Sequence, residues 1–175
     1  MLKKILIIIG AIVLIAAIAV GGYFIYIKCI KNNVGEFQIQ YTYEDYMGLG
    51  NHGYVAGYKG VSPEDVVISE SFEKDGSKRT TYGIKINAFK DNTNMKSVDI
   101  PASVKLISTN SFVGCTNLKT IIFRATESSG LTYSGEFVDV DKETVTVKVA
   151  NDEINAYMET VFTKATIVVD STLAE

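Results

Sequence analysis

The chain is poor in the side chains that most catalytic and metal sites use. Its 175 residues include two cysteines, Cys29 and Cys115, and one histidine, His52. Two cysteines cannot build a disulfide framework, nor a structural zinc site without further ligands. Histidine-dependent catalysis would require His52, which lies in a glycine-rich stretch with no G-x-S-x-G element beside it. We therefore expect no cofactor and no metal, and interpret His52 as an exposed loop residue and Cys115 as a small core residue.

Acidic residues are absent from the first 35 positions. All 20 of them lie from Glu36 onward, together with 13 of the 17 lysines and arginines, so this part has a formal charge of 13 − 20 = −7. Nucleic-acid binding needs clustered basic side chains that displace counterions from phosphates. The acidic excess argues against a nucleic-acid partner.

Charge of either sign is missing from residues 5–27, which read ILIIIGAIVLIAAIAVGGYFIYI without interruption. As a helix this run would reach about 34 Å, enough to cross a hydrocarbon core of about 30 Å. Lysines flank both ends, and Tyr23 and Tyr26 lie where interfacial aromatic residues are favoured. We predict a transmembrane helix or uncleaved signal anchor, with membrane lipid as its partner.

A cleaved signal peptide is the alternative for this segment. Ala17-Ile18-Ala19 resembles a small-x-small cleavage site, but the apolar run continues for eight residues beyond Ala19. The two flanks carry similar numbers of lysines, but the amino-terminal amine adds one positive charge to the N-terminal flank. By the positive-inside rule, this charge favours a cytoplasmic N-terminus. We expect a single-pass cell-membrane protein with an extracellular C-terminal domain, or a secreted one if the segment is cleaved.

Further along the chain, residues of the same chemical type recur at one constant spacing, which indicates a sequence repeat. The aligned residues share chemical type: Ile84 and Ile107, Phe89 and Phe112, Asn94 and Asn117, Met95 and Leu118, Lys96 and Lys119, Val98 and Ile121, Ile100 and Phe123. The repeat length that these pairs define lies within the range typical of leucine-rich repeats. One such unit cannot bury its own apolar face, so the units must stack.

Each unit contains a short alternating segment, Ser97–Ile100 in one and Thr120–Phe123 in the next. Period-two alternation predicts strands that direct Val98, Ile100, Ile121 and Phe123 inward and Ser97, Asp99, Thr120 and Ile122 outward. Phe89 and Phe112 would close the far side of the core. We predict that Val98 and Ile121 lie on adjoining parallel strands and share one interior.

The segment 100–123, IPASVKLISTNSFVGCTNLKTIIF, resembles the BspA-type leucine-rich repeat. The residues on that pattern are Pro101, Ser103, Val104, Ile107, Phe112, Cys115, Leu118 and Ile121. The sequence departs from it at Ser111, where alanine is common, at Asn92, where cysteine is usual, and at Met95, which replaces leucine. The resemblance implies an opening cap over about 54–68 and a closing unit of strand, short helix and strand over 144–170. There Asn151 or Asp152 can cap a helix with Ile154, Tyr157 and Val161 on one stripe.

The predicted fold is a strand-dominated α/β-type solenoid: a short leucine-rich-repeat stack with a strand–helix–strand C-terminal cap, preceded by one transmembrane helix. A strand at 37–43 would shield the first turn. The predicted boundaries are an N-terminal flank at 1–4, the transmembrane helix at 5–27, a linker at 28–35, the N-terminal cap and first turn at 36–83, the repeats at 84–143 and the C-terminal cap at 144–175.

Two motifs fit other chemistries only in part. Residues 48–53 match G-x-G-x-x-G, but a dinucleotide site needs a helix after the loop, and the following YVAGYKGVSP cannot start one. A glycine-rich hairpin between two strands is the better interpretation. Asp139, Asp141 and Glu143 form an acidic run that suggests calcium, but the glycine and the distal glutamate of an EF-hand loop are missing. We interpret this run as a solvated turn.

The resemblance implies a module for protein–protein or cell-surface interaction, because proteins with this repeat are commonly associated with surface attachment. We expect an unknown protein or surface ligand to contact the exposed strand face, at Asp65, Val67, Ser97, Asp99, Thr120, Ile122, Thr146 and Lys148. An ordinary solvated sheet surface is the alternative for these residues. For the protein as a whole, the alternatives are a structural subunit of a membrane complex and an enzyme of unrecognised type.

Overall fold

The structure is a computed structural model that describes residues 31–34, 37–40, 51–74, 76–133, 137 and 139–174. The predicted transmembrane helix at 5–27 and Cys29 lie outside the described residues. Within the described ranges, no helix combines the length and the apolar character that a membrane crossing requires.

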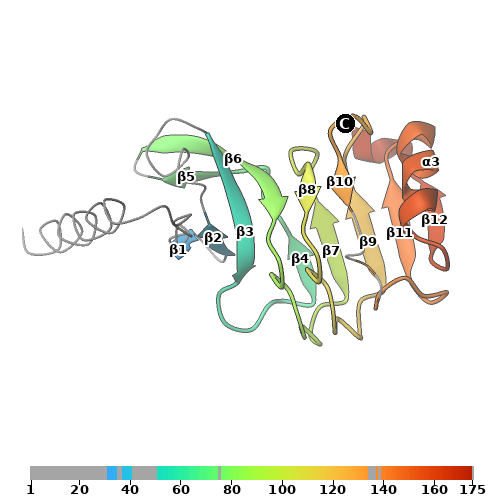
Figure 1. The fold of residues 1–175 in the computed structure, drawn as a ribbon, viewed down its shortest axis with the longest axis horizontal. Coiled ribbons are helices and arrows are strands. Elements are labelled where there is room, and N and C mark those ends of the chain that lie inside the picture. The colour runs from blue at the N-terminus through green and yellow to red at the C-terminus, as the bar shows by residue number, and fades with distance from the viewer. Residues whose placement is uncertain are drawn as a thin grey trace, which may run out of the picture.

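The described chain is strand-dominated, with one α-helix near its C-terminal end (Figure 1). Its elements in chain order are β1 (Lys31–Val34), β2 (Phe37–Gln40), β3 (His52–Tyr58), β4 (Asp65–Val67), β5 (Ser71–Lys74), β6 (Ser77–Ile84), β7 (Ser97–Ile100), β8 (Leu106–Ile107), β9 (Thr120–Phe123), β10 (Thr132–Tyr133), β11 (Thr146–Val149), α3 (Asp152–Val161), β12 (Thr166–Val169) and the 3-10 helix η1 (Ser171–Ala174).

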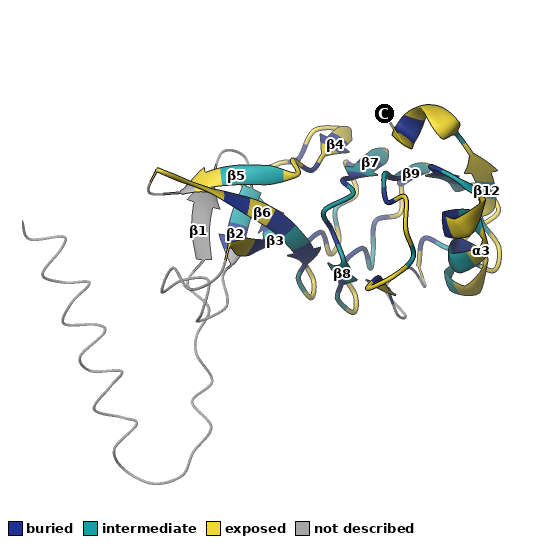
Figure 2. Ribbon diagram, turned by 90° about the horizontal axis from the view of Figure 1, so that it is seen from above, coloured by how far each residue is buried: buried dark blue, intermediate teal, exposed yellow. Residues whose placement is uncertain are grey.

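The strands form two sheets that face each other as the walls of a solenoid (Figure 2). One sheet has five parallel strands in the order β12-β11-β9-β7-β4. The other has seven strands along the path β1-β2-β3-β6-β8-β10, with β5 paired to β6. From β6 to β11 the chain passes from one wall to the other and back in each turn, so each turn adds a strand to each sheet; between β11 and β12 the helix α3 takes the place of such a strand.

The predicted repeat strands are confirmed with their bounds. Val98 on β7 pairs in parallel register with Ile121 on β9, and both side chains are fully buried. Ser97 on β7 pairs with Thr120 on β9, and Thr120 pairs in turn with Thr146 on β11. The segment from Thr120 to Thr146 is slightly longer than the segment from Ser97 to Thr120. The stack therefore continues beyond the two units in which the sequence pattern is most regular.

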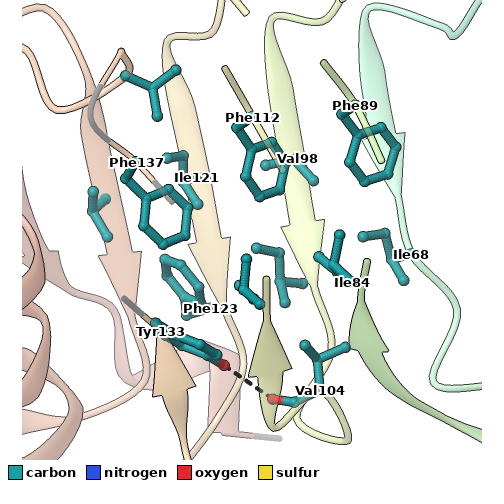
Figure 3. Packing of buried hydrophobic residues seen from close by; sticks show 14 of the residues in the cluster. Ile68, Ile84, Phe89, Val98, Val104, Phe112, Ile121, Phe123, Tyr133 and Phe137 are labelled. Carbon is teal, nitrogen blue, oxygen red and sulfur yellow. Dashed lines mark hydrogen bonds between the residues drawn. The ribbon is translucent and has the colours of Figure 1, made fainter. Parts of the chain in front are cut away.

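A row of phenylalanines fills the interior between the two walls (Figure 3). Phe112 stacks on Phe89 with ring centroids 5.4 Å apart, and on Phe137 at 5.5 Å. The Phe89 and Phe112 positions are as predicted, whereas Phe137 continues the row one turn further along the chain. Stacked rings in register join one turn to the next, because each ring buries the face of its neighbour.

Buried polar groups of the repeat are hydrogen-bonded to the preceding turn. The Ser111 hydroxyl donates to the carbonyl of Lys85 at 3.1 Å, and the Cys115 thiol donates to the carbonyl of Phe89 at 3.1 Å. Burial raises the pKa of Cys115 to about 11. The interpretation of Cys115 as a core residue is confirmed.

Asparagine side chains link successive turns in the same way. The amide of Asn94 donates to the carbonyl of Ser62 at 2.5 Å, that of Asn117 to Thr93 at 2.7 Å, and that of Asn151 to Thr126 at 2.9 Å. Each bond satisfies a carbonyl that belongs to no sheet ladder. The aligned Asn94 and Asn117 thus have one shared role.

The C-terminal cap has the predicted strand, helix and strand. Asn151 is the helix N-cap, since its side chain accepts the N–H of Ile154 at 3.0 Å. The prediction that Ile154 lies on the buried side of the helix is confirmed. The second fully buried residue of α3 is Met158, which was not predicted, whereas the predicted Tyr157 and Val161 are only partly buried.

The N-terminal cap differs from the prediction in three respects. Residues 31–34, within the predicted linker, form β1, which pairs antiparallel with β2. His52 is exposed as predicted, but it begins β3 and its ring lies 4.8 Å from that of Tyr82, so it is a strand residue. The hairpin of β5 and β6 was not predicted. The last two residues of the glycine-rich motif, His52 and Gly53, belong to β3, which pairs antiparallel with β2, so no helix N-terminus follows Gly53.

Candidate interaction face

The solvent side of the five-stranded sheet carries two rows of side chains, which we call the outer face. One row reads Asp65, Ser97, Thr120, Thr146 and Thr166 from β4 to β12, and the other reads Val67, Asp99, Ile122, Lys148 and Val168. Within each row, neighbours occupy matched positions on adjacent strands. None of these residues is buried. All eight residues predicted for the exposed strand face therefore lie together.

The first row is polar and carries little charge. Four of its five members are serine or threonine, and the Ser97 hydroxyl donates to Asp65 Oδ1 at 2.6 Å. Hydroxyls both donate and accept, so this row can adapt to a partner's hydrogen-bonding groups.

The second row contains an ion pair that the sequence did not predict. Arg124 donates from Nε to Asp99 Oδ1 and from Nη2 to Asp99 Oδ2, both at 2.8 Å. The hydrogen bond to Asp99 raises the pKa of the Arg124 guanidinium. Such a two-pronged pair fixes both side chains and neutralises Asp99. Arg124 lies two residues after Ile122, so extending the strand alternation by one step would have found it.

Lys148 also has a partner close by. Its ammonium lies 3.6 Å from Asp170 Oδ2, just after β12. The Thr172 hydroxyl donates a hydrogen bond to Asp170, and this is the main reason that the pKa of Asp170 lies below its usual range. The positive charge of Lys148 lowers this pKa further. Both charged residues of the second row therefore have a counter-charge supplied by this chain.

Aliphatic side chains occupy the remaining positions of the second row. Val67 is 64% exposed, Ile122 is half-buried and Val168 is 41% exposed. They alternate with the two ion-paired residues, so adjacent aliphatic members are two strand spacings apart, or about 9.6 Å. A neutralised surface with regularly spaced aliphatic groups suits a partner that buries apolar surface.

An open hollow of about 390 Å³ adjoins Val67 at one end of the outer face. Its apolar lining comes from β2, β3, β4 and β5 and the residues next to them: Phe37, Ile39, Val55, Val67, Ile68 and Phe72. Glu73 and Thr81 add polar groups at the same place. A partner side chain that enters such a hollow is desolvated on several sides, as in the anchor pockets of protein interfaces.

The acidic run at 139–143 serves the fold. Asp141 accepts the backbone N–H groups of Thr163, Lys164 and Ala165 at 2.7–2.9 Å, as well as the Thr163 hydroxyl. Burial alone would raise the pKa of Asp141, but these hydrogen bonds lower it below the usual value. Asp139 accepts the N–H of Gly114 at 3.2 Å. Within the described ranges, no three histidine, cysteine or acidic side chains converge in a metal-binding arrangement.

Part of the outer face was not predicted from the sequence. Thr166 and Val168 extend the two rows onto β12, and Arg124 and Asp170 neutralise the second row. The strand β12 itself was predicted as part of the C-terminal cap. Its outward residues were not assigned to the rows, because β12 follows β11 at a shorter interval than the repeat length, with a helix in between.

Comparisons with known proteins agree with this architecture. Residues 77–168, 92 of the 175, match a family model described as a BspA type leucine-rich repeat region. A crystal structure of a leucine-rich cell surface protein from Faecalibacterium prausnitzii is similar, with a TM-score of 0.51 and 17% identity over 82% of this chain. A leucine-rich repeat protein from Bacteroides ovatus has a TM-score of 0.50 and 16% identity, also over 82%.

These likenesses concern the fold. The aligned region covers 43% of the Faecalibacterium chain and 38% of the Bacteroides chain, so this chain spans less than half the length of either. No curated protein sequence matches.

Proposed function

The chain belongs to the family of proteins with a BspA type leucine-rich repeat region, and from this premise we propose that it is a surface-displayed module that binds another protein through its outer face. The observation that carries the proposal is the second row, in which Val67, Ile122 and Val168 alternate with ion pairs that the chain itself completes. Binding through such a row removes apolar surface from water without leaving an unpaired charge.

Anchoring to the cell membrane through residues 5–27 is part of the same proposal. This segment is uncharged and long enough to span a bilayer, and a structural relative is a cell surface protein by its description. With the N-terminus in the cytoplasm, the repeat stack would lie outside the cell.

A small and nearly flat face limits the affinity of one copy. Interfaces that bury less than about 1,200 Å² are typically weak and transient. Many copies on one membrane can compensate for this, because a second contact between two cells or surfaces forms at high effective concentration. We therefore propose adhesion through many weak contacts.

Cells that display the full chain test the use of the outer face. The double substitution Val67→Lys with Ile122→Lys should abolish adhesion to a plate coated with solubilised extracellular matrix, because two charges replace aliphatic contacts. Val61→Lys is the matched control, since Val61 is 85% exposed and lies outside the outer face. Equal adhesion of the double variant and the parent would refute the use of this face.

Protease treatment of intact cells tests the topology. External protease should remove the repeat stack from cells that display the parent chain and leave a cytoplasmic control protein intact. Detergent extraction and sizing then address the alternative of a structural subunit, because an obligate subunit would elute only within a larger complex.

A further inference from the structure

The free edge of β12 differs from the free edge at the other end of the same sheet. Among the described strands, β12 pairs only with β11, and β4 only with β7. β4 starts at Asp65, after Pro63 and Glu64, and Glu64 pairs with Lys96 at 2.7 Å. Proline and charge are common devices that keep an edge strand from pairing with another chain. β12 has neither, because its sequence is Thr-Ile-Val-Val.

The β12 edge is also accessible. Val168 and Val169 are 41% and 43% exposed, and Ile167 is half-buried. After β12 the chain turns back into η1, which in both views lies toward the inner strands and not beyond β12 (Figures 1 and 2). The nearest charge, Asp170, already accepts the Thr172 hydroxyl at 2.6 Å.

The backbone of β12 shows which groups are available for pairing. The N–H of Thr166 donates to the carbonyl of Val145 at 3.0 Å, and that of Asp170 to Val149 at 2.8 Å. Since backbone direction alternates along a strand, Val168 also faces β11. Ile167 and Val169 therefore direct their N–H and C=O groups away from the sheet, toward the open edge.

We propose that β12 pairs antiparallel with β12 of a second copy of this chain, about a two-fold axis through Val168. In this register Ile167 exchanges two hydrogen bonds with Val169 of the second copy, and Val169 does the same with the second Ile167. All the outward backbone groups of these residues are then satisfied. Val168 lies opposite its own copy at a non-hydrogen-bonded position, where side chains are closest and the Cα atoms are about 4.5 Å apart.

This register is self-complementary on both sides of the sheet. Ile167 and Val169 point inward like the Val147 and Val149 with which they are paired, so opposing them extends the apolar interior of each stack. Val168 points outward and meets a second Val168. A two-fold contact of this kind closes on itself and forms a dimer, whereas a head-to-tail contact would build a filament.

Pairing would join the outer faces of two copies into one continuous sheet. A four-residue edge is small, so the association is weak in solution and is favoured where two copies share a membrane. The inference stands on the geometry of β12 and does not depend on what the outer face binds.

Disulfide trapping of the full chain in phosphatidylcholine vesicles tests both the pairing and its register. The parent is the Cys29→Ser variant, which retains only the buried Cys115. We expect Val168→Cys to form a covalent dimer under mild oxidation at least about tenfold faster than Val61→Cys, because pairing holds the two thiols at a high effective concentration. Val61 is the more exposed of the two, at 85%, so random collision predicts the reverse order.

Two further variants separate the proposed register from other contacts. Thr166→Cys lies on the same face but opposite Asp170 of the second copy, and it should crosslink as slowly as Val61→Cys. Ile167→Pro removes a donor that points away from β11, and combined with Val168→Cys it should abolish the rapid crosslinking while circular dichroism stays unchanged. Equal rates for Val168→Cys and Val61→Cys, or for Val168→Cys and Thr166→Cys, would overturn the proposal.

Discussion

Phe112 stacks on Phe89 with the two ring planes inclined by only 12°, although a full turn of the stack separates them along the chain. The same side chain stacks on Phe137 on its other side, inclined by 15°. Phe112 is thus the central ring of a row that joins three successive turns (Figure 3). The stability of the stack should depend on it more than on residues at either end.

Phe112→Ala should lower the free energy of unfolding by about 3–5 kcal/mol, because it removes a buried ring and leaves a cavity between two others. Chemical denaturation of the full chain in mild detergent, monitored by circular dichroism, measures this change in the free energy of unfolding. Val61→Ala is the control and should stay within about 0.5 kcal/mol of the parent. A loss below about 1 kcal/mol for Phe112→Ala would mean that the ring row does not join the turns.

Asp141→Ala should destabilise the C-terminal cap in a pH-dependent way. The parent carboxylate accepts three backbone N–H groups, and its pKa in the folded chain is below the usual value. Its ionised form therefore stabilises the fold above the unfolded pKa of about 4, and this stabilisation is lost as the pH falls through the lowered folded pKa.

The expected loss for Asp141→Ala at pH 7 is about 1–3 kcal/mol, and the difference from the parent should shrink below about pH 4. Denaturation curves at several pH values measure it. Asp139→Ala should cost less, because Asp139 accepts only the Gly114 N–H among the hydrogen bonds found in the described chain. A pH-independent difference for Asp141→Ala would show that the ionised carboxylate is not the stabilising form.

Cys115 should resist thiol reagents in the folded protein. Its side chain is buried and its pKa is raised to about 11, so the reactive thiolate is both inaccessible and scarce at neutral pH. In the Cys29→Ser variant, labelling of the native chain should be at least about a thousandfold slower than labelling of the unfolded chain, since it requires opening of the core. Rapid and complete labelling of the native chain would contradict this burial.

The regular part of the fold is predictable from the sequence, because local alternation and long-range repetition point to the same strands. Val98 and Ile121 lie at equivalent points of two alternating segments separated by one repeat length, and their pairing follows. Phe137 was not predicted because its turn is slightly longer than the regular repeat. Met158 was not predicted because the helix stripe was drawn through Tyr157 and Val161.

The chemistry of the outer face was only partly predictable. Alternation places Asp99 and Lys148 on the solvent side, but it cannot show that Arg124 and Asp170 pair with them. Those contacts depend on how side chains from adjacent turns meet, which a single sequence does not record. The pairing changes the interpretation of the face, because it leaves the exposed aliphatic residues as the binding groups that we propose.

Site-specific photo-crosslinking on cells that display the full chain tests whether the outer face contacts a partner protein. A photo-reactive amino acid is placed either at Ile122 on the outer face or at Ile86, which is 59% exposed in the turn after β6. We expect that position 122, on contact with solubilised extracellular matrix, forms one predominant protein adduct that position 86 does not form. The same adduct in equal or greater yield from position 86 would contradict it.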